Sequence, residues 1–486
     1  MEPILFIHGY SSEGKDKSHR KIYGQLPKLL KQAFGKDAIQ ELDLSRWISL
    51  EDGITLNDVS FAMDRALNKE FPHLLASGFH AIIHSTGALV VRNWIRRFSP
   101  KPSPIKNIIH LAGANFGSGL AHVGKGQLAR WGRFIFLDSE PGIQVLNELE
   151  FGSWKTIDLH RHFLQSGNNL YHDYEIQEFC IIGSQTFSGL LKKVIRIIPI
   201  RYVKEDSSDN TVRTCSGNLN FNYIEVTPKP RTFELTSNYI QTQINKREQG
   251  KTINNTYYNV SLDHLSDSRP NIPFMITYET AHFGSDIGIV DGKKNRSQII
   301  THIKAALKTQ YDINAYQKTA ERFKTGLERT LEKVKNLKGG LFNWNKQQQY
   351  EAHSQIIFRI RDQFNNAVPN HDITFHSKKD NESQIALEHM IQDKHHNTKY
   401  PGTLTFYLRT MEYKRKRWNN KISRIAPLDV EITAYEPESD EISYVPLNIC
   451  LSTEDLIRIV QNYCTTIIDI TLVRLPSSHV FKIEKH

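Results

Sequence analysis

The stretch Phe79 to Arg97, FHAIIHSTGALVVRNWIRR, decides how the rest of the chain is read. A short apolar strand over residues 79–83 runs into His84-Ser85-Thr86-Gly87, and a helical pattern with apolar residues on one side follows at once. A serine at so tight a turn sits above the strand end, beside the N–H groups that a helix start leaves without partners. The pattern indicates a nucleophile, and its alternative is a serine that only caps the helix.

These residues resemble the nucleophile elbow of the α/β-hydrolases, Gly-x-Ser-x-Gly, in the His-Ser-x-Gly form found in bacterial lipases, with Ile83 in place of the first glycine. An early strand over residues 3–7 ends in His8-Gly9, which resembles the oxyanion loop of the same enzymes. The resemblance implies that the backbone N–H groups of Tyr10 and Thr86 bind the oxygen on which charge develops when an acyl carbon is attacked.

The elements around the elbow alternate between helix and strand. The periodicity predicts a helix over 18–34 that is interrupted near Pro27, a strand over 38–44, a helix over 56–75 and a strand over 105–111. Alternation of this kind favours a mostly parallel sheet with right-handed crossovers and helices on both faces. We therefore expect an α/β fold, and the resemblance makes it an α/β-hydrolase fold.

The resemblance also supplies the partners of Ser85. Residues 205–212 resemble the loop that carries the acid of the triad, with Asp209 as the expected acid, Asn210 where glycine is usual, and Asp206 as the alternative. His282, on a loop between a strand and a last helix, resembles the catalytic histidine, and His264 is its rival. The chain order Ser, Asp, His is that of the α/β-hydrolases.

We expect a catalytic domain over residues 1–310, with cap or lid insertions at about 119–170 and 187–203. The second insertion is basic and amphipathic, so it either lies on a lipid interface or packs on its own domain. Residues 311–349 are expected to form a helical linker. Short alternating segments after residue 350 predict an accessory β-sandwich over 350–486.

The chain is basic, with a formal net charge of +10. A basic surface favours anionic partners, and since no nucleic-acid-binding motif is found, an anionic membrane surface is the expected one, with simple solubility as the alternative. The run Lys414 to Arg417, followed by Trp418, suits anionic headgroups, although a solvated charge run is the commoner explanation. His395-His396 has no partners at metal-ligand spacing, so neither a metal nor a cofactor is expected.

No stretch is apolar enough to cross a bilayer, and no cleaved secretory signal is found at Met1. Four distant cysteines indicate reduced thiols. These features favour a cytoplasmic protein, or one that is exported without a cleaved signal and works at a membrane.

Taken together, the motifs predict a serine ester hydrolase that forms an acyl-enzyme through Ser85, His282 and Asp209. A lipase, and a phospholipase before a triglyceride lipase, is the expected class. Two alternatives stay open from the residues alone: a thioesterase or deacylase for soluble or protein-bound acyl groups, and a non-catalytic membrane- or protein-binding module on the same fold.

Overall fold

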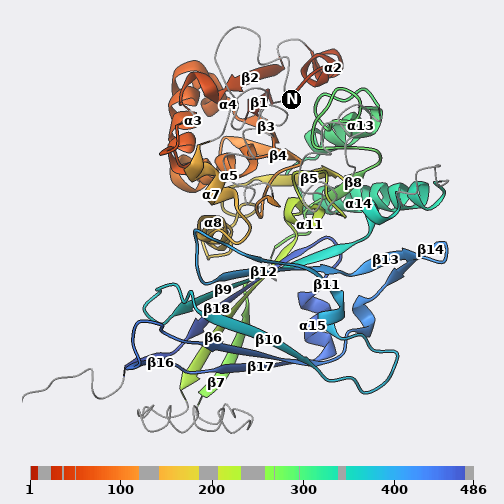
Figure 1. Cartoon of the computed structure of the whole chain (residues 1–486). Helices are drawn as coiled ribbons and strands as arrows, with labels where there is room; N and C mark the ends of the chain where they lie inside the picture. Colours follow the sequence, from red (N-terminus) through yellow and green to blue (C-terminus); the bar gives the residue numbers. More distant parts are fainter. Residues whose placement is uncertain are drawn as a thin grey trace, which may run out of the picture. The chain divides into compact units, whose positions relative to one another are not determined.

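The computed structural model describes residues 2–8, 23–35, 38–49, 51–119, 142–184, 206–230, 258–266, 269–294, 296–337 and 346–476. The chain forms two compact units (Figure 1). The first comprises residues 1–220, 268–353 and 412–419, and the second comprises residues 221–267, 354–411 and 420–486.

A six-stranded sheet in the order β2-β1-β3-β4-β5-β8 forms the centre of the first unit. Every pair that it contains is parallel. Its strands are β1 (Ile4–His8), β2 (Ile39–Asp43), β3 (Phe79–His84), β4 (Ile105–Leu111), β5 (Gln177–Gly183) and β8 (Phe274–Thr277). The central strands are buried along almost their whole length, as expected of a parallel sheet with helices on both faces.

Helices connect these strands. They are α2 (Leu26–Phe34), α3 (Leu56–Glu70), α4 (Pro72–Ser77), α5 (Gly87–Phe98), α7 (Ile143–Leu149), α8 (Trp154–His162), α11 (Thr214–Gly217), α13 (Arg296–Leu307) and α14 (Ile313–Lys335). Helices α3 and α5 lie on one side of the strands and α13 lies on the other (Figure 1). The fold class expected for this part of the chain is therefore confirmed.

The single helix predicted over 56–75 is two helices in the structure. Pro72 has no N–H to donate, and its ring disfavours helical geometry at the residue before it, so α3 ends at Glu70 and α4 begins with Pro72 in its first turn. The start of α3 is fixed by a capping box, in which the Thr55 side chain accepts from the Asp58 N–H and the Asp58 carboxylate accepts from the Thr55 N–H.

Helix α14 belongs to the first unit and is more than a linker. Its apolar stripe packs on the end of the parallel sheet, with Tyr316 5.5 Å and Phe323 6.2 Å from the ring of Phe179 on β5. The Tyr316 hydroxyl donates to the Glu178 carbonyl oxygen at 2.6 Å. The apolar stripe of this helix is thus buried within the first unit.

The second unit contains two packed sheets, as the expected β-sandwich requires. One has six strands in the order β11-β12-β9-β18-β6-β7, and the other has three in the order β10-β15-β17. The strands of the larger sheet are β6 (Phe221–Pro230), β7 (Tyr258–His264), β9 (His353–Asp362), β11 (Ile391–His396), β12 (Thr403–Arg409) and β18 (Thr465–Leu472). The smaller sheet comprises β10 (His371–Ser377), β15 (Leu428–Ala434) and β17 (Leu447–Leu451).

Side chains from both sheets share one apolar core. Phe375 of β10 lies 5.0 Å from Phe406 of β12, measured between ring centroids, and Phe406 lies 5.8 Å from Phe358 of β9. A buried ion pair joins three strands of the larger sheet: the Arg359 guanidinium and the Tyr223 hydroxyl both donate to the Asp469 carboxylate, at 2.6 and 2.7 Å.

The boundaries between the units differ from the contiguous ones expected from sequence. Strand β6 pairs in parallel with β18, and β7 pairs with β6, so residues 221–264 complete the larger sheet of the second unit. In the other direction, most of a hairpin of β13 (Met411–Lys414) and β14 (Arg417–Asn420) belongs to the first unit. The Tyr413 N–H donates to the Glu351 carboxylate at 2.9 Å, which fastens the hairpin there.

Short elements complete the description. They are the strands β16 (Ile442–Tyr444) and β19 (Arg474–Pro476), helix α15 (Thr453–Ile459), and single 3-10 turns at Leu44–Arg46, Gln348–Tyr350, Leu387–Met390 and Ile422–Arg424. Within the described ranges, no helix combines the length and the apolar character that crossing a membrane requires.

Candidate active site

Ser85 lies at the turn between β3 and α5 with a backbone φ of +54°. Such a conformation is costly for a residue with a Cβ, and it is held here by hydrogen bonds from both sides: the Ser85 N–H donates to Leu111 O and the Ala114 N–H donates to Ser85 O, both at 3.2 Å. Ile83 fits where the motif has glycine because it is still within β3, buried and in register with Ile7 and His110.

The structure brings Ser85, His282 and Asp209 together. The Ser85 Oγ lies 3.0 Å from His282 Nε2, and His282 Nδ1 lies 2.9 Å from Asp209 Oδ2. His282 and Asp209 are buried, whereas Ser85 is partly exposed. The serine is thus the member of this chain of contacts that an incoming molecule can reach, with an imidazole positioned to accept its proton.

The loop of Asp209 is folded around its own carboxylate. Asp209 Oδ1 accepts the N–H groups of Thr211 and Val212 at 3.0 and 2.8 Å, which leaves Oδ2 for His282. Asn210 has a φ of +81°, so it takes the left-handed conformation that the related motif assigns to glycine. Asparagine tolerates this conformation better than most residues, and this explains why it can stand in for glycine.

The loop of His282 is held at several points. The Ala281 N–H donates to Ile287 O at 2.9 Å, and the His282 N–H donates to Asp209 O at 3.1 Å. Asp291 accepts the Gly284 N–H at 3.0 Å, and burial raises the pKa of this carboxyl. At the start of the loop, a Cβ on Gly183 of β5 would lie 2.0 Å from the Thr280 carbonyl oxygen. Only glycine allows the approach between strand β5 and this loop.

The alternatives left open by the sequence lie elsewhere. His264 is the last residue of β7 in the second unit, opposite Ile224. His282 contacts the carboxylate of Asp209. It does not contact Asp206, the alternative acid, which lies three residues before Asp209 in the same loop.

Of the two expected oxyanion donors, Tyr10 lies outside the described residues. Thr86 is buried at the N-terminus of α5, and its N–H donates none of the hydrogen bonds found among the described residues. The insertion expected at 187–203 also lies outside the described residues. The described part of the insertion at 119–170 includes α7 and α8.

A buried polar cluster behind the elbow was not anticipated from the sequence. The Arg92 Nη1 of α5 lies 2.5 and 2.6 Å from the two carboxylate oxygens of Glu178 on β5, and His110 Nε2 lies 3.0 Å from Glu178 Oε1. His160 Nε2 donates to Asn115 O at 2.6 Å in the loop that follows β4. The signal for this cluster is a charged or imidazole side chain inside each of three otherwise apolar runs.

Burial and neighbouring charges set the protonation of this cluster. Burial would raise the pKa of Glu178, but the Arg92 guanidinium and the bond from His110 lower it to about 2. Burial lowers the pKa of His110, and it lowers that of His160 further, with the Arg92 charge adding to the effect at both. The cluster is therefore a buried ion pair flanked by two neutral imidazoles.

No group of three or more His, Cys, Asp or Glu side chains in the described residues is arranged to hold a metal ion. The groups that the structure brings together at Ser85 are a hydroxyl, an imidazole and a carboxylate.

Comparison with known proteins supports the fold. Neither a protein-family model nor a curated protein matches the sequence. Among solved structures, phospholipase PlaB from Legionella pneumophila superposes with a TM-score of 0.76 at 22% identity, and the match covers 100% of this chain and 96% of that chain. This chain has an α/β-hydrolase fold. A second PlaB structure, in complex with thio-NAD, gives a TM-score of 0.75 with the same identity and coverage. The similarity to PlaB therefore extends over both units.

Proposed function

We propose that this chain is a serine-dependent carboxylic ester hydrolase that acts on membrane lipid, and on phospholipid before triglyceride. The observation that carries the proposal is the chain of contacts from Ser85 Oγ through His282 to Asp209, at 3.0 and 2.9 Å, on an α/β-hydrolase fold. The same three residues, in the same order, are those that the sequence motifs predict.

In the proposed reaction, Ser85 Oγ attacks the acyl carbonyl carbon while its proton passes to His282 Nε2. The carbonyl oxygen becomes an oxyanion that the Thr86 N–H and, by resemblance, the Tyr10 N–H would bind. The C–O bond to the alcohol then breaks, and His282 returns the proton to the leaving oxygen. Water attacks the acyl-enzyme with His282 again as base, which releases the fatty acid and restores Ser85. Asp209 holds His282 in one tautomer and stabilises its cation.

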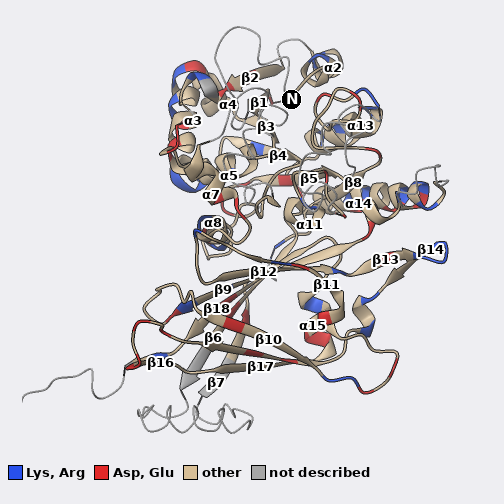
Figure 2. Ribbon diagram, viewed as in Figure 1, with Lys and Arg blue, Asp and Glu red and all other residues tan. Residues whose placement is uncertain are grey.

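Two observations support a lipid substrate. The similar PlaB structure is described as a phospholipase. The hairpin β13–β14 carries exposed basic residues at its turn (Figure 2), where Arg415 and Lys416 have φ of +52° and +60°. This conformation usually selects glycine or asparagine. Two long cations at such a turn suit contact with anionic headgroups, so we propose that the chain works at an anionic membrane surface.

The test compares wild type with Ser85→Ala on vesicles of labelled anionic phospholipid, with released fatty acid as the readout. Ser77→Ala, a serine on α4 outside the site, is the matched control. We expect wild type and Ser77→Ala to release fatty acid and Ser85→Ala to fold but release none.

Fatty acid release by Ser85→Ala near the wild-type rate would overturn the triad. A soluble thioester or short-chain ester hydrolysed in solution as fast as at vesicles would favour the thioesterase alternative. Vesicle binding by wild type without turnover of any ester would favour a binding module.

A further inference from the structure

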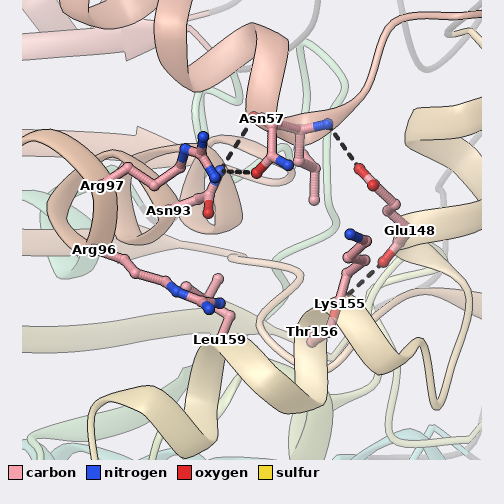
Figure 3. Close-up of a pocket in the computed structure, with 9 residues that line it drawn as sticks. Asn57, Asn93, Arg96, Arg97, Glu148, Lys155, Thr156 and Leu159 are labelled. Atoms are coloured by element: carbon pink, nitrogen blue, oxygen red, sulfur yellow. Dashed lines mark hydrogen bonds between the residues drawn. The ribbon is translucent and has the colours of Figure 1, made fainter.

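A pocket of about 110 Å³ lies on the first unit, between helices α3, α5, α7 and α8. Its lining is dominated by polar and charged side chains, as Figure 3 shows. Arg96 and Arg97 come from the last turn of α5, and Lys155 comes from the first turn of α8. The pocket is thus built where the end of the helix that follows Ser85 meets the start of α8.

Arg96, Arg97 and Lys155 form no hydrogen bond or ion pair with any side chain or carbonyl group in the described part of the chain. The Arg97 guanidinium lies 5.8 Å from the centre of the Phe98 ring. These three exposed cations repel one another where they meet at the pocket, so an anion in the pocket would be attracted by all three.

The one acidic residue among those that line the pocket, Glu148, offsets only part of this positive charge, through its electrostatic interaction with Lys155. Glu148 is buried, and its Oε2 accepts the Leu56 N–H at 2.7 Å, so it serves the start of α3. Burial raises the pKa of this carboxyl. Even with Glu148 ionised, three positive charges against one negative charge leave a net charge of +2.

A fixed amide donor adds to the charges. Asn93 Nδ2 donates to Asn57 Oδ1 at 3.0 Å and to Ser60 Oγ at 3.0 Å. The side-chain oxygen of Asn57 accepts from Asn93, so the Nδ2 group of Asn57 is left with two N–H donors. No hydrogen bond among the described residues uses them. Figure 3 shows both amides at the pocket, beside Arg97.

We propose that this pocket is a binding site for a phosphate group. A net charge of +2 complements a phosphate dianion, and guanidinium and amide donors match its oxygens in geometry. The volume exceeds what a single water needs, about 10–15 Å³, and is below the roughly 300 Å³ at which sites for whole drug-sized ligands begin. The phosphate group is therefore either a free ion or small monoester, or the headgroup of an anionic lipid.

The site is distinct from the one at Ser85. Arg96 lies nine residues beyond Gly87 on the same helix, which at 1.5 Å per residue is roughly 14 Å along its axis. A phosphate held by both Arg96 and Lys155 would join α5 to α8. Helix α8 is also held to the loop after β4, because His160, next to the pocket residue Leu159, donates to Asn115 O. Binding is therefore expected to raise the thermal stability of the first unit.

The experiment measures binding of inorganic phosphate to the full chain by calorimetry and by the shift in Tm, with sodium chloride at the same ionic strength as the reference because salt screens exposed charges. The variant is Arg96→Gln with Lys155→Gln. The control removes equal charge from exposed positions away from the pocket, Arg65→Gln with Lys318→Gln. We expect wild type and control to bind equally and the pocket variant to bind at least tenfold more weakly, with the Tm shift lost.

A second arm separates the two sources of the phosphate group. It measures binding to vesicles of phosphatidylcholine with and without phosphatidic acid. A loss confined to phosphatidic acid vesicles in the pocket variant assigns the site to lipid headgroups, and a loss confined to free phosphate assigns it to a soluble ligand. Equal behaviour of pocket variant and control in both arms overturns the proposal. Equal affinity for acetate and phosphate overturns the assignment to phosphate. Neither arm depends on Ser85, so the phosphate-site proposal can fail while the hydrolase proposal holds, and the reverse.

Discussion

The imidazole of His84 lies against the imidazole of His282, with ring centroids 4.6 Å apart, and its Nε2 lies 3.2 Å from the His282 carbonyl oxygen. A carbonyl oxygen only accepts, so His84 donates through Nε2 in this contact. The residue that precedes the proposed nucleophile therefore holds the backbone of the residue proposed to take the nucleophile's proton.

We expect His84→Ala to lower kcat by about fivefold with little change in KM, since the variant loses one hydrogen bond, worth about 1 kcal/mol, that positions His282. His84→Gln keeps an N–H donor and should recover part of the loss. Steady-state kinetics on one ester substrate provides the measurement. An unchanged kcat in His84→Ala would show that the contact has no part in positioning His282.

Asp209→Asn should lower kcat by about 10³- to 10⁴-fold, because an amide no longer fixes the tautomer of His282 or stabilises its cation. Asp206→Asn, in the same loop, is the matched control and should stay within about threefold of wild type. Circular dichroism establishes that both variants fold. Equal losses in the two variants would contradict the choice of Asp209 as the acid.

Gly183→Ala should lower both stability and turnover, since the added Cβ would lie 2.0 Å from the Thr280 carbonyl oxygen and push away the loop of His282. Gly53→Ala is the matched control, because a Cβ there meets no atom within 4 Å. Thermal unfolding and ester hydrolysis are measured on both. Wild-type values for Gly183→Ala would mean that the loop shifts without consequence.

Arg92→Met should destabilise the fold by about 3–5 kcal/mol, because it leaves the buried Glu178 carboxylate without its guanidinium. Adding Glu178→Leu should recover much of this loss, since replacing a whole buried pair by apolar groups is often nearly neutral. Urea unfolding of both single variants and the double variant measures the coupling. Strict additivity of the two losses would contradict a coupled pair.

Acidification should weaken the fold in two stages. The pKa values of His110 and His160 are lowered in the folded protein, so below about pH 6.5 these histidines are protonated in the unfolded chain but not in the folded one. The free energy of unfolding therefore falls as the pH drops below about 6.5. Glu178 adds a second loss between about pH 4.5 and pH 2, because its folded pKa is lowered.

His160→Gln keeps a donor for Asn115 O and removes one titrating group, so its stability should depend less steeply on pH between about 7 and 5. Urea midpoints at several pH values test this. An unchanged pH dependence in the variant would mean that His160 is not held neutral.

The site residues that can be predicted from sequence are those that lie in short local motifs. The turn at Ser85 and the loops of Asp209 and His282 each carry a local pattern, and their order along the chain narrows the choice. The pattern leaves His264 as an alternative to His282, and the structure places His264 on β7 in the second unit, away from Ser85. Its placement depends on the pairing of β6 with β18, which no local pattern encodes.

The buried cluster of Arg92, Glu178, His110 and His160 was harder to predict for a different reason. Arg92, His110 and Glu178 each lie in a largely apolar run, and this signals a buried polar group that needs a partner. Which groups become partners depends on how α5 and α8 pack on β4 and β5, and several arrangements would satisfy the same residues. The fold class was predictable from alternating elements, whereas the unit boundaries were not.

The pairing of β6 with β18 also has a consequence for how the protein forms in the cell. The chain leaves the first unit after Asn220, contributes two strands to the second, and returns to supply β8 and His282. Strand β6 emerges from the ribosome long before residues 465–472, its partner in the parallel ladder, have been synthesised. Contacts between such distant segments form slowly, and an open strand edge invites association with other chains. The emerging polypeptide must therefore be kept from aggregating during translation, and cutting the chain near residue 350 would leave the β6 edge exposed in the fragment.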